Sequence, residues 1–81
     1  QLTIYPNPTT GIFTLQINNG KLSIINYQLS IYNTLGEKVY STIQPFSHST
    51  IDLSSQPKGI FFIQLRHENG IRIHTQKVII Q

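Results

Sequence analysis

The chain has 81 residues and a net charge of +3, and it contains no Cys, Met, Trp or Ala. This length corresponds to one small domain over residues 1–81, and the missing cysteines exclude disulfide scaffolds, thiolate zinc sites and cysteine catalysis. The six Lys and Arg are scattered, so the basic stripe of a nucleic-acid binder is absent from the sequence and no nucleic-acid partner is expected.

The 24 β-branched residues (14 Ile, 2 Val and 8 Thr) favour pleated sheets over helices, and the best helix former, Ala, is missing. Alternating apolar and polar residues predict seven short strands: residues 2–5, 12–17, 27–32, 38–43, 50–53, 60–67 and 71–80. Pro and Gly turns separate them, which is typical of a sandwich or barrel. Residues 21–26 are less periodic and are interpreted as a loop or a weak strand.

The alternation also assigns strand faces. Residues 13, 15, 17, 27, 29 and 31 are expected to face the core, with the polar residues between them on the opposite face. In the strand at 38–43, Val39 and Ile43 are expected inside, whereas Lys38, Tyr40 and Thr42 are expected outside. The outward aromatics Tyr32, Tyr40 and Phe62 offer a possible sugar-binding platform, although they are more simply interpreted as cover for a small core.

The last hairpin has two possible registers, and the buried pattern favours a three-residue loop at 68–70 with a left-handed Gly70. This register implies four facing pairs: Leu65–Ile73, Arg66–Arg72, Gln64–His74 and His67–Ile71. A pairing of Leu65 with His74 would contradict it. Unbroken alternation would turn Val78 and Ile80 outward, so a bulge near residues 75–77 is expected to return them to the core.

Catalytic and metal-binding arrangements find little support. The predicted register separates His67 from His74, and His48 lies in a loop without Cys, so the three histidines are interpreted as surface residues. A Ser–His–Asp triad could be drawn from Ser47 or Ser49, His48 and Asp52, but no nucleophile-elbow motif surrounds these serines. The three carboxylates lie in separate turns, and the glycines are dispersed. The sequence therefore predicts no enzyme activity, no cofactor and no metal.

Four segments, in order and over nearly the whole chain, resemble the type A C-terminal sorting domain of the type IX secretion system. Residues 5–13 read YPNPTTGIF, similar to the family's YPNP-x-x-G-x-F start. Residues 31–39 (IYNTLGEKV) and 52–62 (DLSSQPKGIFF) resemble its two middle segments, and residues 77–80 (KVII) resemble its basic-then-apolar end. Phe61 stands where the family often has Tyr, and residues 18–26 form a somewhat long connection.

The resemblance implies an Ig-like antiparallel β-sandwich of about seven strands, carried at the C-terminus of secreted cargo from the Bacteroidota. The implied partners are the outer-membrane type IX translocon, its shuttle proteins, the N-terminal cargo domain, and a sortase-like cysteine protease. The implied route runs through the periplasm and outer membrane to the cell surface. There the protease usually cuts at or before Leu2 and joins the cargo to an anionic lipopolysaccharide. Residues 1–5 lack the features of a signal peptide, so the chain is expected to be a piece of a longer precursor.

The candidate recognition residues come from the four segments. They are Tyr5, Pro6, Asn7, Pro8, Gly11, Phe13, Gly36, Lys38, Val39, Gly59, Ile60, Phe62, Lys77, Val78, Ile79 and Ile80. Residues 77–80 and the neighbouring edge are expected to form the main recognition surface, because an edge strand offers unpaired amides to a receptor. The rigid 6–11 turn is expected to provide a pre-set backbone that limits the ordering entropy on binding. The alternatives are an Ig-like surface adhesion or carbohydrate-binding module, which a glycan array would detect, and a passive spacer.

Overall fold

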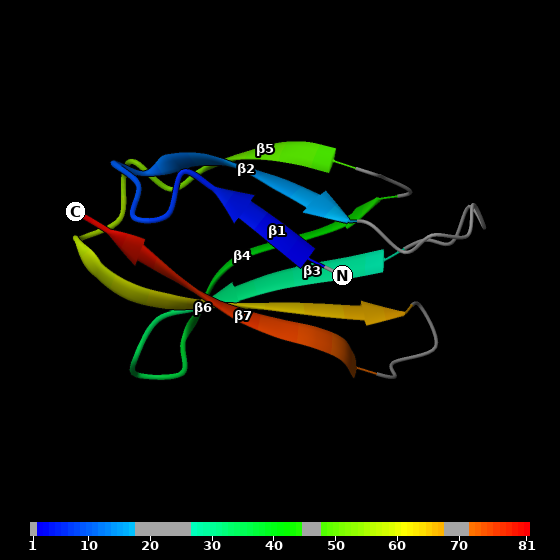
Figure 1. Ribbon diagram of the computed structural model, residues 1–81. Coiled ribbons are helices and arrows are strands. Elements are labelled where there is room, and N and C mark those ends of the chain that lie inside the picture. Colours follow the sequence, from blue (N-terminus) through cyan, green and yellow to red (C-terminus); the bar gives the residue numbers. More distant parts are fainter. Residues whose placement is uncertain (1, 18–26, 45–47, 68–71) are drawn as a thin grey trace.

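The computed structural model describes residues 2–17, 27–44, 48–67 and 72–81, and these form a sandwich of two antiparallel sheets (Figure 1). The strands are β1 (Leu2–Tyr5), β2 (Ile12–Ile17), β3 (Tyr27–Tyr32), β4 (Lys38–Gln44), β5 (His48–Asp52), β6 (Gly59–His67) and β7 (Arg72–Ile80). One sheet has the order β1-β2-β5 and the other β4-β3-β6-β7. This separation of strands between two sheets is that of an Ig-like sandwich, so the predicted fold is confirmed.

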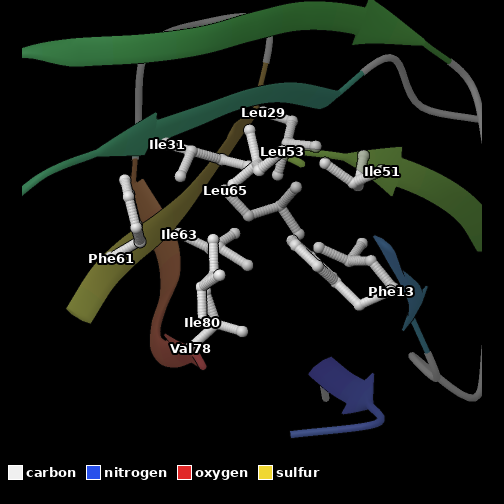
Figure 2. Close-up of a cluster of buried hydrophobic side chains, with 11 residues drawn as sticks. Phe13, Leu29, Ile31, Ile51, Leu53, Phe61, Ile63, Leu65, Val78 and Ile80 are labelled. Carbon is white, nitrogen blue, oxygen red and sulfur yellow. The ribbon is translucent and has the colours of Figure 1, made fainter. Parts of the chain in front are cut away.

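The core lies between the two sheets, and strands β2, β3, β5, β6 and β7 contribute fully buried side chains to it (Figure 2). The buried cluster consists of Phe13, Leu15, Leu29, Ile31, Ile51, Leu53, Phe61, Ile63, Leu65, Val78 and Ile80. Alternate residues of each strand supply this cluster because successive side chains of a strand point to opposite faces of its sheet. The inward positions predicted at 13, 15, 29 and 31 are therefore confirmed.

The face assignment in β4 is correct for Lys38, which is exposed, and for Val39, which packs against the core, but it is wrong beyond Val39. A bulge between Ile31 and Tyr32 makes Ile31 pair with Tyr40 and Tyr32 pair with Lys38, which leaves Val39 as the extra residue. The bulge reverses the alternation beyond Val39, so Tyr40 packs against the core, whereas Ile43 is 66% exposed. Thr42 accordingly pairs with the buried Leu29 rather than pointing away from the core.

The register predicted for the last hairpin is also wrong over most of its length. Arg66 does face Arg72, but the register then shifts and Leu65 faces His74, with Gln64 opposite Thr75. One bulge at this point, rather than one near residues 75–77, brings Val78 and Ile80 into the core, where both are buried. The bulge thus has the predicted effect but lies closer to the turn. The loop at 68–70 and the weak segment at 21–26 lie outside the described residues.

Candidate functional site

The segments that resemble the sorting family meet at one end of the sandwich, which we call the motif end. It consists of the 6–11 turn, the 33–37 turn, the 53–58 turn and the last residues of β7. Strand pairing brings them together: Thr9 forms a parallel bridge with Ile80, which also pairs with Gly59 at the start of β6. In Figure 1 these turns lie on the side of the view where the C-terminus is marked. Segments separated by up to 70 residues therefore build a single surface.

The 6–11 turn is organised around a buried threonine. The hydroxyl of Thr9, a residue only 3% exposed, donates to the carbonyl of Ile12 (2.8 Å) and accepts from the amide of Gly11 (3.1 Å). Both proline peptide bonds, Tyr5-Pro6 and Asn7-Pro8, are cis. A hydroxyl that satisfies nearby backbone groups holds a turn in one conformation. Thr9 was not among the predicted residues, although a Thr between Pro8 and Gly11 is a sequence sign of such a turn.

The same turn also forms hydrogen bonds to the end of β7, through Asn7 and Thr9, and we call this set of contacts the clasp. The side-chain amide of Asn7 donates to the carbonyl of Lys77 (3.1 Å), and its oxygen accepts from the amide of Ile79 (3.1 Å). The backbone of Thr9 donates to the carbonyl of Ile79 (2.9 Å) and accepts from the amide of Gln81 (2.8 Å). Four hydrogen bonds therefore occupy this part of the β7 edge, so its backbone groups are already paired within the chain.

Gly11 joins the 6–11 turn to the 53–58 turn. Its carbonyl accepts from the amide of Leu53 at 2.7 Å, and a Cβ at this position would lie 2.8 Å from the Cα of Ser54. Its φ of +130° is a conformation that side-chain-bearing residues rarely adopt. Close backbone approach and backbone conformation both require glycine here.

Asp52 organises the start of the 53–58 turn. Its carboxylate accepts hydrogen bonds from the hydroxyl of Ser54 (2.6 Å) and from the amide of Ser54 (2.9 Å). The bond from the hydroxyl has the larger effect and the bond from the amide the smaller one. Both hold the pKa of the Asp52 carboxyl below its ordinary value, because they stabilise the charged form. The Asp52 carboxylate therefore holds the turn. The side chains of Ser47 and His48 lie outside the part of the chain that the structure describes. The catalytic arrangement considered from the sequence gains no support.

The 33–37 turn is held by one asparagine. The side-chain oxygen of Asn33 accepts from the amides of Leu35 and Glu37 (both 2.9 Å), and its nitrogen donates to the carboxylate of Glu37 (2.8 Å). Gly36 completes the turn with a φ of +83°. The turn presents Leu35 at its tip, where the side chain is 83% exposed. An apolar side chain held this far into solvent by a rigid turn is a candidate contact for a partner.

A shallow pocket of about 190 Å³ lies between the 33–37 and 53–58 turns, and its lining includes Leu35, Pro57 and Ile60. Ile60 is 40% exposed, so apolar surface continues from the turn onto β6. Leu35 and the pocket were missed from the sequence, because neither strand periodicity nor turn chemistry distinguishes an exposed apolar turn residue from a buried one.

The sixteen predicted residues fall into three groups. Turn and edge positions at or beside the motif end are Tyr5, Pro6, Asn7, Pro8, Gly11, Gly36, Gly59, Ile60 and Ile79. Fully or partly buried positions are Phe13, Val39, Val78 and Ile80. The remaining three, Lys38, Phe62 and Lys77, are exposed on the outer face of the four-stranded sheet. Of the last segment, Val78 and Ile80 therefore belong to the core, and only Lys77 and Ile79 reach the surface.

Two further expectations concern chemistry. The separation of His67 from His74 rested on the pairing of Gln64 with His74, which is wrong; within the described residues, no group of three or more potential metal ligands occurs. Of the aromatics considered as a sugar platform, Tyr32 and Phe62 lie on the outer face of the sheet as expected, but Tyr40 packs against the core.

No helix of the described residues is long and apolar enough to cross a membrane.

Comparison with known proteins identifies the family. No curated protein matches the chain. A family model described as the secretion system C-terminal sorting domain matches residues 3–81, essentially the whole chain. The four segments that meet at the motif end, and the match that covers them all, place this chain in the family of type IX secretion C-terminal sorting domains.

Proposed function

We propose that this domain is read, in its folded state, by the outer-membrane type IX translocon and its shuttle proteins, so that its cargo is exported from the periplasm to the cell surface. The match of residues 3–81 to the sorting-domain family carries this proposal. A folded signal needs rigid exposed features, because a partner then loses less free energy to ordering when it binds. The motif end has such features, since two turns are fixed by Thr9 and Asn33.

Within the motif end, we assign the direct contact to the apolar surface formed by Leu35, Pro57 and Ile60. This surface combines an 83% exposed leucine with a shallow pocket beside it, and it is built by two of the four family segments. The segment at residues 77–80 has a different part: Val78 and Ile80 fill the core, and its backbone is clasped by Asn7 and Thr9. It acts mainly by shaping the motif end, while Lys77 and Ile79 add exposed contacts.

The later steps are also part of the proposal. A sortase-like cysteine protease cuts at the upstream junction and joins the cargo to an anionic lipopolysaccharide at the surface. Leu2 pairs with Ile17, at the opposite end of β2 from Gly11 and the motif end. A receptor bound at the motif end would therefore leave the junction accessible. The domain contributes no catalytic group and is removed as the spent signal.

Export of a reporter fused to the N-terminus tests the proposal in a type IX-competent host. Deletion of residues 77–81 is expected to abolish export, because it removes core residues as well as the clasp. The sharper variant is Leu35→Ser, which changes an exposed side chain and leaves the core intact. We expect it to lower export about tenfold, corresponding to the loss of one well-packed apolar contact at an interface.

Ile43→Ser is the matched control, because Ile43 is also an exposed apolar residue, at 66%, but lies at the other end of β4. It should export the reporter within about twofold of the original chain, as a surface change away from the contact has little effect. Thermal unfolding of both variants confirms that they fold. Normal export by folded Leu35→Ser would contradict the assigned contact, and normal export after deletion of residues 77–81 would contradict the sorting function itself.

A further inference from the structure

The outer face of the four-stranded sheet carries a row of two aromatic rings between two lysines. Tyr32 pairs with Lys38 on β4 and with Phe62 on β6, and Phe62 pairs in turn with Lys77 on β7. The chain neighbours Ile31, Phe61 and Val78 are buried, so the row itself points away from the core. The row crosses three strand spacings, which amounts to roughly 14 Å.

The side chains of this row are accessible. Lys38 and Lys77 are exposed, Phe62 is 38% exposed and Tyr32 is half-buried. The ammonium group of Lys38 lies 5.9 Å from the centroid of the Tyr32 ring, which keeps its charge beside the aromatic surface. The Lys38 cation therefore borders the Tyr32 ring, and Lys77 lies opposite Phe62 in the strand pairing.

The rows on either side complete an amphipathic surface. Towards the motif end, Ile60 pairs with Ile79 and extends the apolar area. On the other side lies a polar row, in which Ser30, Gln64 and Thr75 follow one another across β3, β6 and β7. Ser30 is buried, so Gln64 and Thr75 are the accessible members of this row. Arg66 lies beyond this row on β6, and its Nε donates to the side-chain oxygen of Gln64 at 3.0 Å.

The charge of this face has one sign. None of the four strands β3, β4, β6 and β7 contains an Asp or a Glu. Two carboxylates adjoin these strands in sequence: Glu37, in the 33–37 turn, accepts a hydrogen bond from Asn33, and Glu68 lies outside the described residues. A surface with cations and without carboxylates attracts anions, and complementary charge also speeds their association.

We propose that this face binds an acidic polysaccharide. The flat rings of Tyr32 and Phe62 fit the apolar C–H faces of sugar units, and Gln64 and Thr75 provide an amide and a hydroxyl group for sugar hydroxyls. Lys38 and Lys77, at the two ends of the aromatic row, meet carboxylate or phosphate groups spaced along the polymer. A flat row open at both ends suits an extended chain molecule. This binding is a further activity beside the sorting function, and its surface shares Ile60, Lys77 and Ile79 with the edge of the motif end.

Binding of the full chain to polygalacturonate oligosaccharides tests the proposal, with calorimetry or fluorescence anisotropy at low salt as the measurement. Lys77→Gln and Lys38→Gln are each expected to weaken binding about threefold, as typical for exposed ion pairs. Phe62→Ser is expected to weaken it about tenfold through loss of an aromatic contact. Added salt should weaken binding by the original chain more than binding by the lysine variants.

Matched controls separate this face from the general positive charge. Lys58→Gln removes the same charge from the 53–58 turn, and Tyr5→Ser removes an exposed aromatic ring from β1 of the other sheet. Both should bind within about twofold of the original chain, as expected for surface changes outside the contact. Thermal unfolding checks each variant, and if Phe62→Ser fails to fold, the comparison of Lys77→Gln with Lys58→Gln decides alone.

Three results would overturn the proposal. Equal weakening by Lys58→Gln and Lys77→Gln would mean that net charge alone binds the polymer. Equal affinity for polyglutamate would mean that sugar rings are not recognised. Absence of binding to polygalacturonate, with or without binding to vesicles of anionic phospholipid, would exclude this class of ligand. None of these results depends on export, so failure here is distinguishable from failure of the sorting function.

Discussion

Two turns at the motif end each depend on an asparagine side chain, but the two asparagines act over different distances. Asn33 bonds to Leu35 and Glu37, within four residues of itself, in an exposed turn. Asn7 bonds to Lys77 and Ile79, which lie 70 and 72 residues away along the chain. The first asparagine shapes a loop that presents Leu35, whereas the second fixes the position of a strand. The difference implies that the 6–11 turn contributes more to global stability and the 33–37 turn more to recognition.

The glycines of the two turns give the largest expected difference. Gly11→Ala should destabilise the fold by about 3 kcal/mol or more, because the new Cβ would meet the Ser54 backbone at 2.8 Å and φ is +130°. Gly36→Ala should lose only about 1 kcal/mol, since φ is +83° but no atom lies within 4 Å of the new Cβ. Urea denaturation of both variants measures this. Equal losses would contradict the view that the 6–11 turn is the one coupled to the rest of the fold.

The two asparagines should differ in the same direction by a smaller amount. Asn7→Ala should lose about 1–2 kcal/mol, because it breaks two hydrogen bonds that hold β7. Asn33→Ala should lose about 0.5–1 kcal/mol, because its bonds join residues of a single turn and hold no other strand in place. Denaturant unfolding gives the free energies, and amide exchange at Ile79 shows whether the clasp has opened. If Asn33→Ala exposed the Ile79 amide as much as Asn7→Ala, the distinction between the turns would fail.

The smallest expected effect concerns Asp52, whose carboxylate bonds to Ser54 at the start of the 53–58 turn. The folded-state pKa of Asp52 lies below the ordinary value of 3.8. The hydrogen bonds to Ser54 therefore stabilise the fold fully above the ordinary pKa, and this stabilisation is lost as the pH falls through the folded-state pKa. Asp52→Ala should therefore lower the melting temperature at about pH 7 and have little effect at about pH 2. Ser54→Ala, which removes the stronger of the two bonds, should show the same trend. A constant difference across this pH range would show that the charge of Asp52 is unimportant.

Local patterns were sufficient to predict the strands. Residues 2–5, 12–17 and 27–32 are strands with the predicted bounds, and the other four agree within two residues at each end. Proline and glycine likewise located the turns, because their effects on φ operate within one or two residues. The resemblance to the sorting family rested on the same local segments, and its four blocks turned out to be the parts that meet at the motif end.

The errors arose where the chain departs from strict alternation. The bulges at Ile31/Tyr32 and Leu65/Arg66 changed which residues face inward, so Tyr40 is inside and Ile43 outside, and Leu65 faces His74. A bulge inserts one residue without a local sequence signal, and it is selected by how well the two strands bury their side chains together. This selection acts on pairs of strands, which a single strand's pattern does not contain.

The sequence by itself therefore determined the all-β class, the strand positions and the polar turns, because each depends on backbone preferences and side-chain alternation within a few residues. Only the tertiary structure decided that Asn7 bonds to β7, that the bulge turning Val78 and Ile80 into the core lies at Leu65/Arg66, and that Leu35 is exposed beside a pocket. It also aligned Lys38, Tyr32, Phe62 and Lys77 in one row. These features depend on contacts between distant segments, whose geometry exists only once both sheets have paired and packed together.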